Sequence, residues 1–257
     1  MIITNTIKVR TFISVLFFSM FLSINSFAQS SDSTDIDNYV PQSEFRALRL
    51  GLVGGMGISW MKPKTQGYEK DGSTFTYNYG LVVDYNFTEN YTFSSGVNFN
   101  RIGGKLKFPN DTNVVGSIKE IGTLHRTYYI NSIEIPTILK LKTSQMGYFT
   151  YFAMIGLRHN LTLSSFANDR LEHNGSVTET YDIDMADFTT FYRVSFNMGL
   201  GTEYSLSQTL SAFGYLEYDN GLNSSLNDEK TNKDGELRSP NENAFIRKFA
   251  LTIGFLF

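Results

Sequence analysis

Cysteine is absent from the 257-residue sequence, and proline occurs only five times. The absence of cysteine excludes disulfides, thiolate metal sites and a lipid-modified N-terminal cysteine. There is no basic surplus either, since the formal net charge is −3, and nucleic acid is therefore not expected as a partner. What is abundant is aromatic and small: 22 Phe, 15 Tyr and 21 Gly, a mixture rich in strand and turn formers.

The only long apolar run lies near the N-terminus. Lys8 and Arg10 precede Phe12–Leu22, and small residues lead to a predicted cleavage site after Ala28. The run is shorter than the about 20 residues of a membrane-spanning helix, but it has the length of a secretory signal. We therefore predict a signal peptide over residues 1–28.

The rest of the sequence divides into a short leader and one domain. Residues 29–46 are polar and acidic without periodicity, which predicts a flexible periplasmic leader. Residues 47–257 repeat segments in which apolar and polar or small residues alternate, the pattern of strands with two unlike faces. The predicted strands are Ala47–Trp60, Phe75–Phe87, Tyr91–Leu106, Arg126–Lys142, Tyr148–Ser164, Phe188–Ser205, Leu210–Leu222 and Phe245–Phe257.

The lengths of the connections favour a membrane barrel. Short connections of a few residues alternate without exception with long ones. The long connections are Met61–Thr74, Lys107–His125, Ser165–Asp187 and Asn223–Ala244. Outer-membrane barrels have short periplasmic turns and long external loops, whereas a lipocalin-like soluble barrel has mostly short connections. The fold class is therefore all-β: an eight-stranded antiparallel up-and-down transmembrane β-barrel with short periplasmic turns and four long external loops.

The two strand faces differ in a way that suits lipid outside. In Phe188–Ser205, for example, Tyr192 and Val194 alternate with Arg193 and Ser195. The second set is mostly small and polar, which suits a crowded lumen better than a water-exposed surface. Aromatic residues gather near the strand ends, as in interfacial girdles. We expect the apolar face to contact lipid and the protein to lie in the outer membrane of a Gram-negative bacterium.

The alternation also places charges of both signs inside the barrel. These residues are Arg49, Asp84, Glu134, Lys140, Arg158, Arg193, Glu203, Glu217 and Asp219. An eight-stranded barrel is filled by side chains, and buried charges must be paired. We therefore predict a structural ion-pair network. A gated polar path and a proton relay remain as alternatives.

Catalytic and metal-binding patterns are weak. The histidines are His125, His159 and His173, and only the first and last could meet at the external rim. No nucleophile motif accompanies them, so we expect no enzyme activity, no cofactor and no metal. An acidic group could offer oxygens to calcium, but its spacing lacks the glycine and terminal glutamate of a complete calcium loop. It consists of Asp182, Asp184 and Asp187.

Three features indicate partners in the envelope. The terminal Phe257 closes an alternating strand and is similar to the signal that the barrel assembly machinery reads. Lipid is the expected solvent of the apolar face. Three lysines around the second long connection could contact lipopolysaccharide phosphates, although solvated lysines would look the same: Lys105, Lys107 and Lys119.

One segment resembles a known family. Tyr129–Lys142 contains Glu134-Ile135-Pro136 followed by Leu139-Lys140, and Tyr148–Leu157 follows with a glycine near its end. This pattern is similar to the PorT-like outer-membrane β-barrel family of Bacteroidota, and the resemblance extends over about Leu48 to Phe257. It implies a small barrel, and its founding member implies a second possibility, a subunit of a type IX secretion or gliding machinery or another envelope complex.

The sequence thus favours a small non-enzymatic outer-membrane barrel that is structural or binds through its external loops. The alternatives are the secretion subunit and, less favoured, a lipid- or peptide-modifying barrel enzyme.

Overall fold

The computed structural model describes residues 44–115, 118–226 and 243–257, with side chains left undescribed over 110–121. The predicted signal peptide and nearly all of the predicted leader lie outside the described residues. Within those residues, no helix is long and apolar enough to cross a membrane.

Nine strands and one 3-10 helix make up the described domain. Their bounds are β1 Leu48–Pro63, β2 Glu69–Asn86, β3 Tyr91–Val115, β4 Ile118–Lys142, β5 Phe149–His173, β6 Ser176–Asp184, η2 Ala186–Phe188, β7 Tyr192–Ser205, β8 Ser211–Gly221 and β9 Ala244–Leu256.

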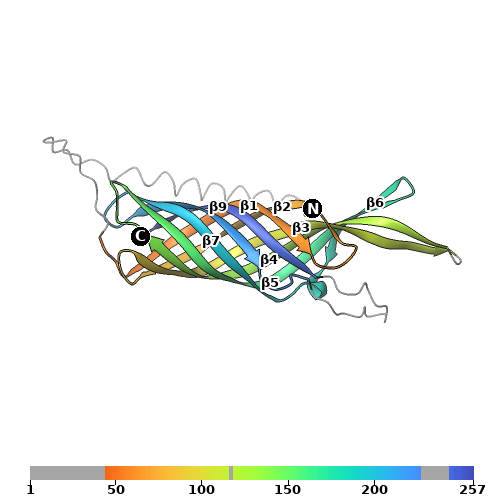
Figure 1. Ribbon diagram of the computed structural model, residues 1–257, viewed down its shortest axis with the longest axis horizontal. Helices are drawn as coiled ribbons and strands as arrows, with labels where there is room; N and C mark the ends of the chain where they lie inside the picture. Colours follow the sequence, from red (N-terminus) through yellow and green to blue (C-terminus); the bar gives the residue numbers. More distant parts are fainter. Residues whose placement is uncertain (1–43, 116–117, 227–242) are drawn as a thin grey trace, which may run out of the picture. The chain divides into compact units, whose positions relative to one another are not determined.

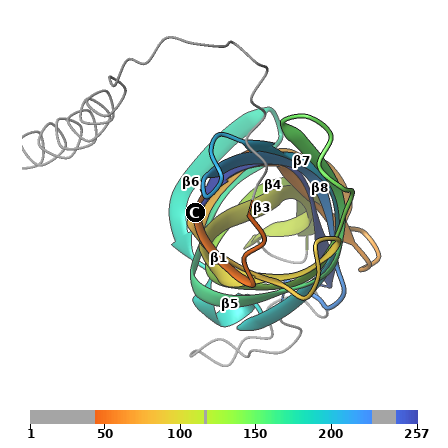
Figure 2. The ribbon, with the colours of Figure 1, turned by 90° about the vertical axis from the view of Figure 1, so that its left-hand side faces the viewer.

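Eight of these strands form a closed antiparallel ring. Strands β1 to β5 pair in chain order, β5 pairs with β7, and the order continues through β8 and β9 back to β1. The end-on view shows the closed ring, and the side view shows hairpins that project beyond it (Figures 1 and 2). Strand β6 is outside the ring and pairs with the distal part of β5. The predicted eight-stranded up-and-down barrel is confirmed.

The long connections differ from the prediction. The predicted loop Lys107–His125 is mostly strand, because β3 and β4 continue as a paired hairpin to Val115 and Ile118. The predicted loop Ser165–Asp187 likewise contains the end of β5 and all of β6. The predicted loop Met61–Thr74 shortens to residues 64–68. Most of the predicted loop Asn223–Ala244 lies outside the described residues.

The prediction missed these extensions because their outward side chains are charged and polar, as in loops. The paired segments still bury a stripe of apolar side chains on their inner face, and that stripe holds them in the sheet. Its members are Met61, Ile102, Leu106, Phe108, Leu124, Tyr128, Ile130, Ala167, Met185, Leu226, Ala244 and Ile246. The hairpins are therefore continuations of the barrel wall rather than loops.

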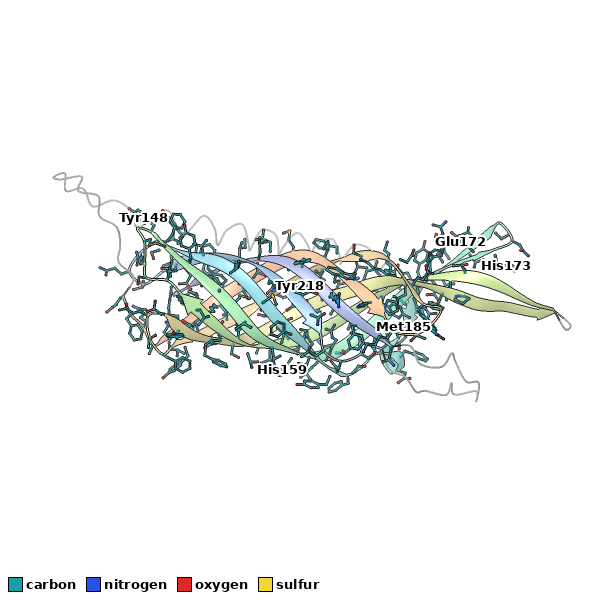
Figure 3. The ribbon with its side chains drawn as sticks, viewed as in Figure 1. Tyr148, His159, Glu172, His173, Met185 and Tyr218 are labelled. Carbon is teal, nitrogen blue, oxygen red and sulfur yellow. The ribbon has the colours of Figure 1, made fainter. Side chains whose placement is uncertain are left out.

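The apolar strand faces point outward, as predicted. Leu200 and Leu216 are among the most exposed large side chains, at 69% and 65% exposure, although both lie in the middle of their strands. Figure 3 shows side chains covering the outer wall along the length of the barrel. A wall of exposed leucine and phenylalanine is stable in lipid and would aggregate in water.

Pro136 interrupts one ladder of the barrel. The register of β3 with β4 is the same on either side of it, but no pairs form between Ser94↔Ile138 and Asn98↔Glu134. On its other side, Pro136 remains paired with Arg158 of β5. The missing N–H of proline explains why only one ladder breaks.

Leu216→Arg tests the outward face. If Leu216 contacts acyl chains, arginine there should lower the free energy of unfolding by roughly 2–4 kcal/mol, because the charge must enter the bilayer. Val177→Arg is the matched control, since Val177 is also exposed but lies on the projecting β6. The measurement is urea unfolding in phospholipid vesicles, and equal effects of the two substitutions would contradict a lipid-facing Leu216.

Candidate functional site

The structure places all nine sequence-predicted charges inside the barrel. Each is at most 8% exposed: Arg49, Asp84, Glu134, Lys140, Arg158, Arg193, Glu203, Glu217 and Asp219. They come from β1, β2, β4, β5, β7 and β8, at positions where strand pleating turns the side chain inward. The barrel interior is therefore a polar core.

Arg158 is the centre of the larger charge cluster. Its guanidinium donates to the carboxylates of Glu134 and Glu217, and its Nε lies 3.4 Å from Asp219 Oδ1. The Lys248 ammonium lies 2.8 Å from Asp219 Oδ2 and 3.2 Å from Glu217 Oε1. Three carboxylates thus meet two cations in a space that excludes bulk solvent.

Asparagine amides complete this cluster. Asn100 Nδ2 donates to Glu134 Oε2 at 3.1 Å. Asn197 Nδ2 donates to Asp219 Oδ1 at 2.7 Å and is 3.3 Å from Glu217 Oε2. These neutral donors supply further hydrogen bonds to the carboxylates without adding charge.

Arg193 departs from the predicted pairing. Its Nε and Nη2 have no hydrogen-bond partner among the described residues. Arg193 lines a cavity of about 20 Å³ together with Glu134, Asp219 and Lys248. A cavity of this size accommodates about one water molecule, so it cannot conduct.

A second charge cluster lies nearer the short connections. Lys140 Nζ contacts Asp84 Oδ2 at 2.7 Å, and Ser94 Oγ donates to Asp84 Oδ1 at 2.5 Å. Arg49 and Lys142 share one carboxylate, at 3.0 Å and 2.8 Å from the Glu203 oxygens. Beyond this cluster a recess of about 510 Å³ opens at the short-connection end.

Apolar layers separate the charge clusters. Along β4 the buried residues are, in order, Lys140, Ile138, Pro136, Glu134, Ser132, Ile130 and Tyr128. Phe152, Phe213 and Tyr215 pack across the barrel at the level between the two clusters. These rings therefore place an apolar layer between the two charge clusters.

Sequence reasoning missed several members of these clusters. Lys248 lies on the polar face of the last strand, and Lys142 follows Lys140 by two positions, so the alternation could have found both. Arg126 and Asp169 form a bidentate pair at 2.6 Å between β4 and β5. That pair was missed because Asp169 lies in a segment predicted as loop.

The histidines do not converge. His125 Nδ1 lies 2.8 Å from Asp71 Oδ2, whereas His173 contacts the neighbouring Asn174. His159 Nδ1 shares a hydrogen bond with the Tyr192 hydroxyl on the outer wall. The positions of His159 and His173 are marked in Figure 3. Across the described ranges, no group of three His, Asp or Glu residues is arranged to hold a metal ion.

The predicted acidic group is dispersed too. Asp184 Oδ1 accepts from the backbone N–H of Ala186, and Asp182 has a positive φ of 56°. Asp184 therefore caps the turn that leads into η2, a structural role within its own segment. Phe257 pairs through its backbone with Leu50 and leaves its ring exposed; its part in assembly stays a prediction.

Removal of Arg158 should be strongly destabilising. Arg158→Ala leaves three buried carboxylates facing Lys248, and we expect a loss of about 3–5 kcal/mol of unfolding free energy in vesicles. Arg170→Ala is the control, because Arg170 forms a half-exposed pair with Glu172 at 3.0 Å and should cost less than about 1 kcal/mol. Similar small losses for both variants would show that the Arg158 contacts contribute little.

The layered interior also predicts that the barrel does not conduct. Purified protein in planar bilayers should give no reproducible current steps, because side chains fill an eight-stranded barrel. A sixteen-stranded porin in the same bilayers serves as the positive control. Stable single-channel steps from the pure folded protein would overturn the closed interior.

Comparison with known proteins agrees with this architecture. The family described as "Outer membrane protein beta-barrel domain" matches residues 27–227, which include every strand before β9. No curated protein matches the chain.

Solved structures of similar fold include three small barrels. Neisserial surface protein A is 9% identical over 80% of this chain and 95% of its own, with a TM-score of 0.40. The attachment invasion locus protein Ail of Yersinia pestis is 11% identical over 81% and 98%, with a TM-score of 0.31. OprG of Pseudomonas aeruginosa is 12% identical over 82% and 95%, with a TM-score of 0.32. By the family match, this chain belongs to the outer membrane protein beta-barrel domain family, and its barrel lies in the outer membrane.

Proposed function

We propose that this protein is a non-enzymatic barrel whose projecting sheet binds an extended polypeptide outside the cell. The observation that carries the proposal is the open edge of β6. Strand β6 pairs only with β5 in the described domain, and its nine residues are almost all exposed. An unpaired edge offers backbone N–H and C=O groups to an added strand.

The projecting sheet consists of β6 and the distal parts of β5, β4 and β3, side by side in that order. Its base is fixed in two ways. Leu124 and Leu171 pack on the apolar stripe, and Arg126 holds Asp169 across the β4–β5 ladder. A platform anchored in this way loses little entropy on binding, which favours affinity.

The usable edge is about one short strand in length. Asp182, with its positive φ, ends the regular extended backbone, and the ladder with β5 shifts between Ala167 and Asp169. The segment before that point presents two large exposed side chains, Val177 at 52% and Tyr181 at 63%. We therefore expect a peptide that adds one strand and contacts these two side chains.

Edge-blocking substitutions test the proposal. Lysines on an edge strand discourage strand addition. Ten-residue peptides are first selected for binding to the folded wild-type protein in detergent. Their affinity for the Val177→Lys/Tyr181→Lys variant should be at least about tenfold lower than for the wild type. Thr123→Lys/Thr127→Lys is the matched control, since it adds the same charge to β4 inside the same sheet and should leave affinity within about twofold.

The peptide backbone gives an independent readout. Two sets of peptides are N-methylated at alternate positions, one at the odd and one at the even residues. Methylation of one set should abolish binding and that of the other should be tolerated, because only every second N–H faces the sheet. A difference in SDS-gel migration between unheated and heated samples, equal to that of the wild type, would establish that each variant is folded. Peptides that bind both lysine variants equally, or tolerate methylation at every position, would disprove strand addition.

Membership of a secretion or envelope complex is the alternative that the PorT-like resemblance implies. Partners that co-purify from mild-detergent extracts equally with wild-type protein and the β6 variant would favour that alternative.

A further inference from the structure

The outer wall at the long-hairpin end carries a group of cations above the apolar surface. We define the cation belt as six residues from β9, β1, β2 and β3 and the segment after β1: Lys62, Lys64, Lys70, Arg101, Lys105 and Arg247.

The strand register makes this belt continuous. Arg247 of β9 is opposite Trp60 of β1, and Lys62 is opposite Phe245. On the next ladder, Lys105 and Arg101 of β3 are opposite residues of β2. The six cations therefore span four neighbouring strands at one level of the barrel.

Aromatic rings lie directly against several of these cations. The Arg101 guanidinium carbon is 4.8 Å from the centre of the Tyr129 ring and 5.1 Å from that of Phe166. Lys70 Nζ is 5.0 Å from the Trp60 ring centre, and Lys64 Nζ is 4.4 Å from that of Phe245. Aromatic side chains at strand ends mark the lipid–water interface, so these cations lie at headgroup level.

The belt has no counter-ions among the described residues. None of its six members forms an ion pair there, and Arg247 Nε is buried without a hydrogen-bond partner. Two carboxylates of β2 are already engaged: Glu69 with Lys107 at 2.9 Å, and Asp71 with His125 at 2.8 Å. The surplus contrasts with the chain as a whole, whose net charge is −3.

The cations of the lumen differ from those of the belt in having carboxylate partners. Arg158 and Lys248 each contact two or more carboxylates, whereas the belt cations face outward without them. The short-connection end has no comparable surplus, since Arg46 there lies 3.9 Å from Glu44. Cations without protein partners at the lipid–water interface can pair with the anionic groups of the membrane itself.

We propose that the cation belt binds the phosphorylated headgroups of the outer-leaflet glycolipid, lipopolysaccharide. The two arginines can hold a phosphate through paired N–H donors, and the four lysines act as mobile point charges around them. The aromatic rings orient the cation stems toward the headgroups. The binding is independent of β6 and of any polypeptide that β6 recruits.

The test uses folded full-length protein in detergent micelles, with diphosphoryl lipid A as the probe. Arg101→Gln/Lys105→Gln/Arg247→Gln should weaken lipid A binding by at least about tenfold, and added salt should weaken wild-type binding. The matched control is Arg46→Gln/Lys107→Gln/Arg170→Gln, which removes three cations that already have carboxylate partners. We expect less than about a twofold change for it.

Two further arms identify the ligand. Dephosphorylated lipid A should bind the wild-type protein no more tightly than diphosphoryl lipid A binds the belt variant. Millimolar inorganic phosphate should not displace lipid A from the wild-type protein. If the belt variant fails to fold, Lys62→Gln/Lys64→Gln/Lys70→Gln, at exposed positions, gives the same comparison. Equal losses in belt and control variants, equal binding of dephosphorylated lipid, or full competition by free phosphate would each overturn the proposal.

Discussion

The structure depends on charge pairing around Arg158 in a space without bulk water. The apolar side chains of the outer wall gain no free energy by turning inward, because lipid solvates leucine as well as a protein interior does. The interior must therefore be held by contacts of another kind, and the Arg158 and Lys248 cluster with Glu134, Glu217 and Asp219 supplies them. Ion pairs of the cluster therefore connect β4, β5, β8 and β9 across the interior of the barrel.

The protein uses the same side-chain types differently at three levels. Most cations in the lumen contact carboxylates, those on the projecting sheet pair at its surface, and several of the cation belt lie against aromatic rings on the outer wall. Aromatic residues change role in parallel: Phe213 and Tyr215 fill the lumen, whereas Trp60 and Tyr129 support cations outside. Position relative to the bilayer therefore decides what each residue type contributes.

Much of this architecture could be predicted from alternation alone. Strict alternation of side chains gave the strand count, the outward face and the inward position of residues such as Glu134, because a strand has only two faces. The extended hairpins could not be predicted, since Lys107 and His125 above the membrane are as polar as loop residues and their pairing is visible only in the register. Which charges meet was also beyond the sequence: Arg158 and Glu217 are 59 residues apart.

The contact between β9 and β1 has a consequence for biogenesis. Gly51 pairs with Leu256, so the seam that closes the cylinder joins segments from opposite ends of the domain. Until that seam forms, the curved sheet has two unpaired edge strands, β1 and β9. Such an intermediate is slow to complete and prone to mispairing with other chains, because distant segments must find each other. Shielding of those two edges during insertion is thus a requirement that the topology itself imposes.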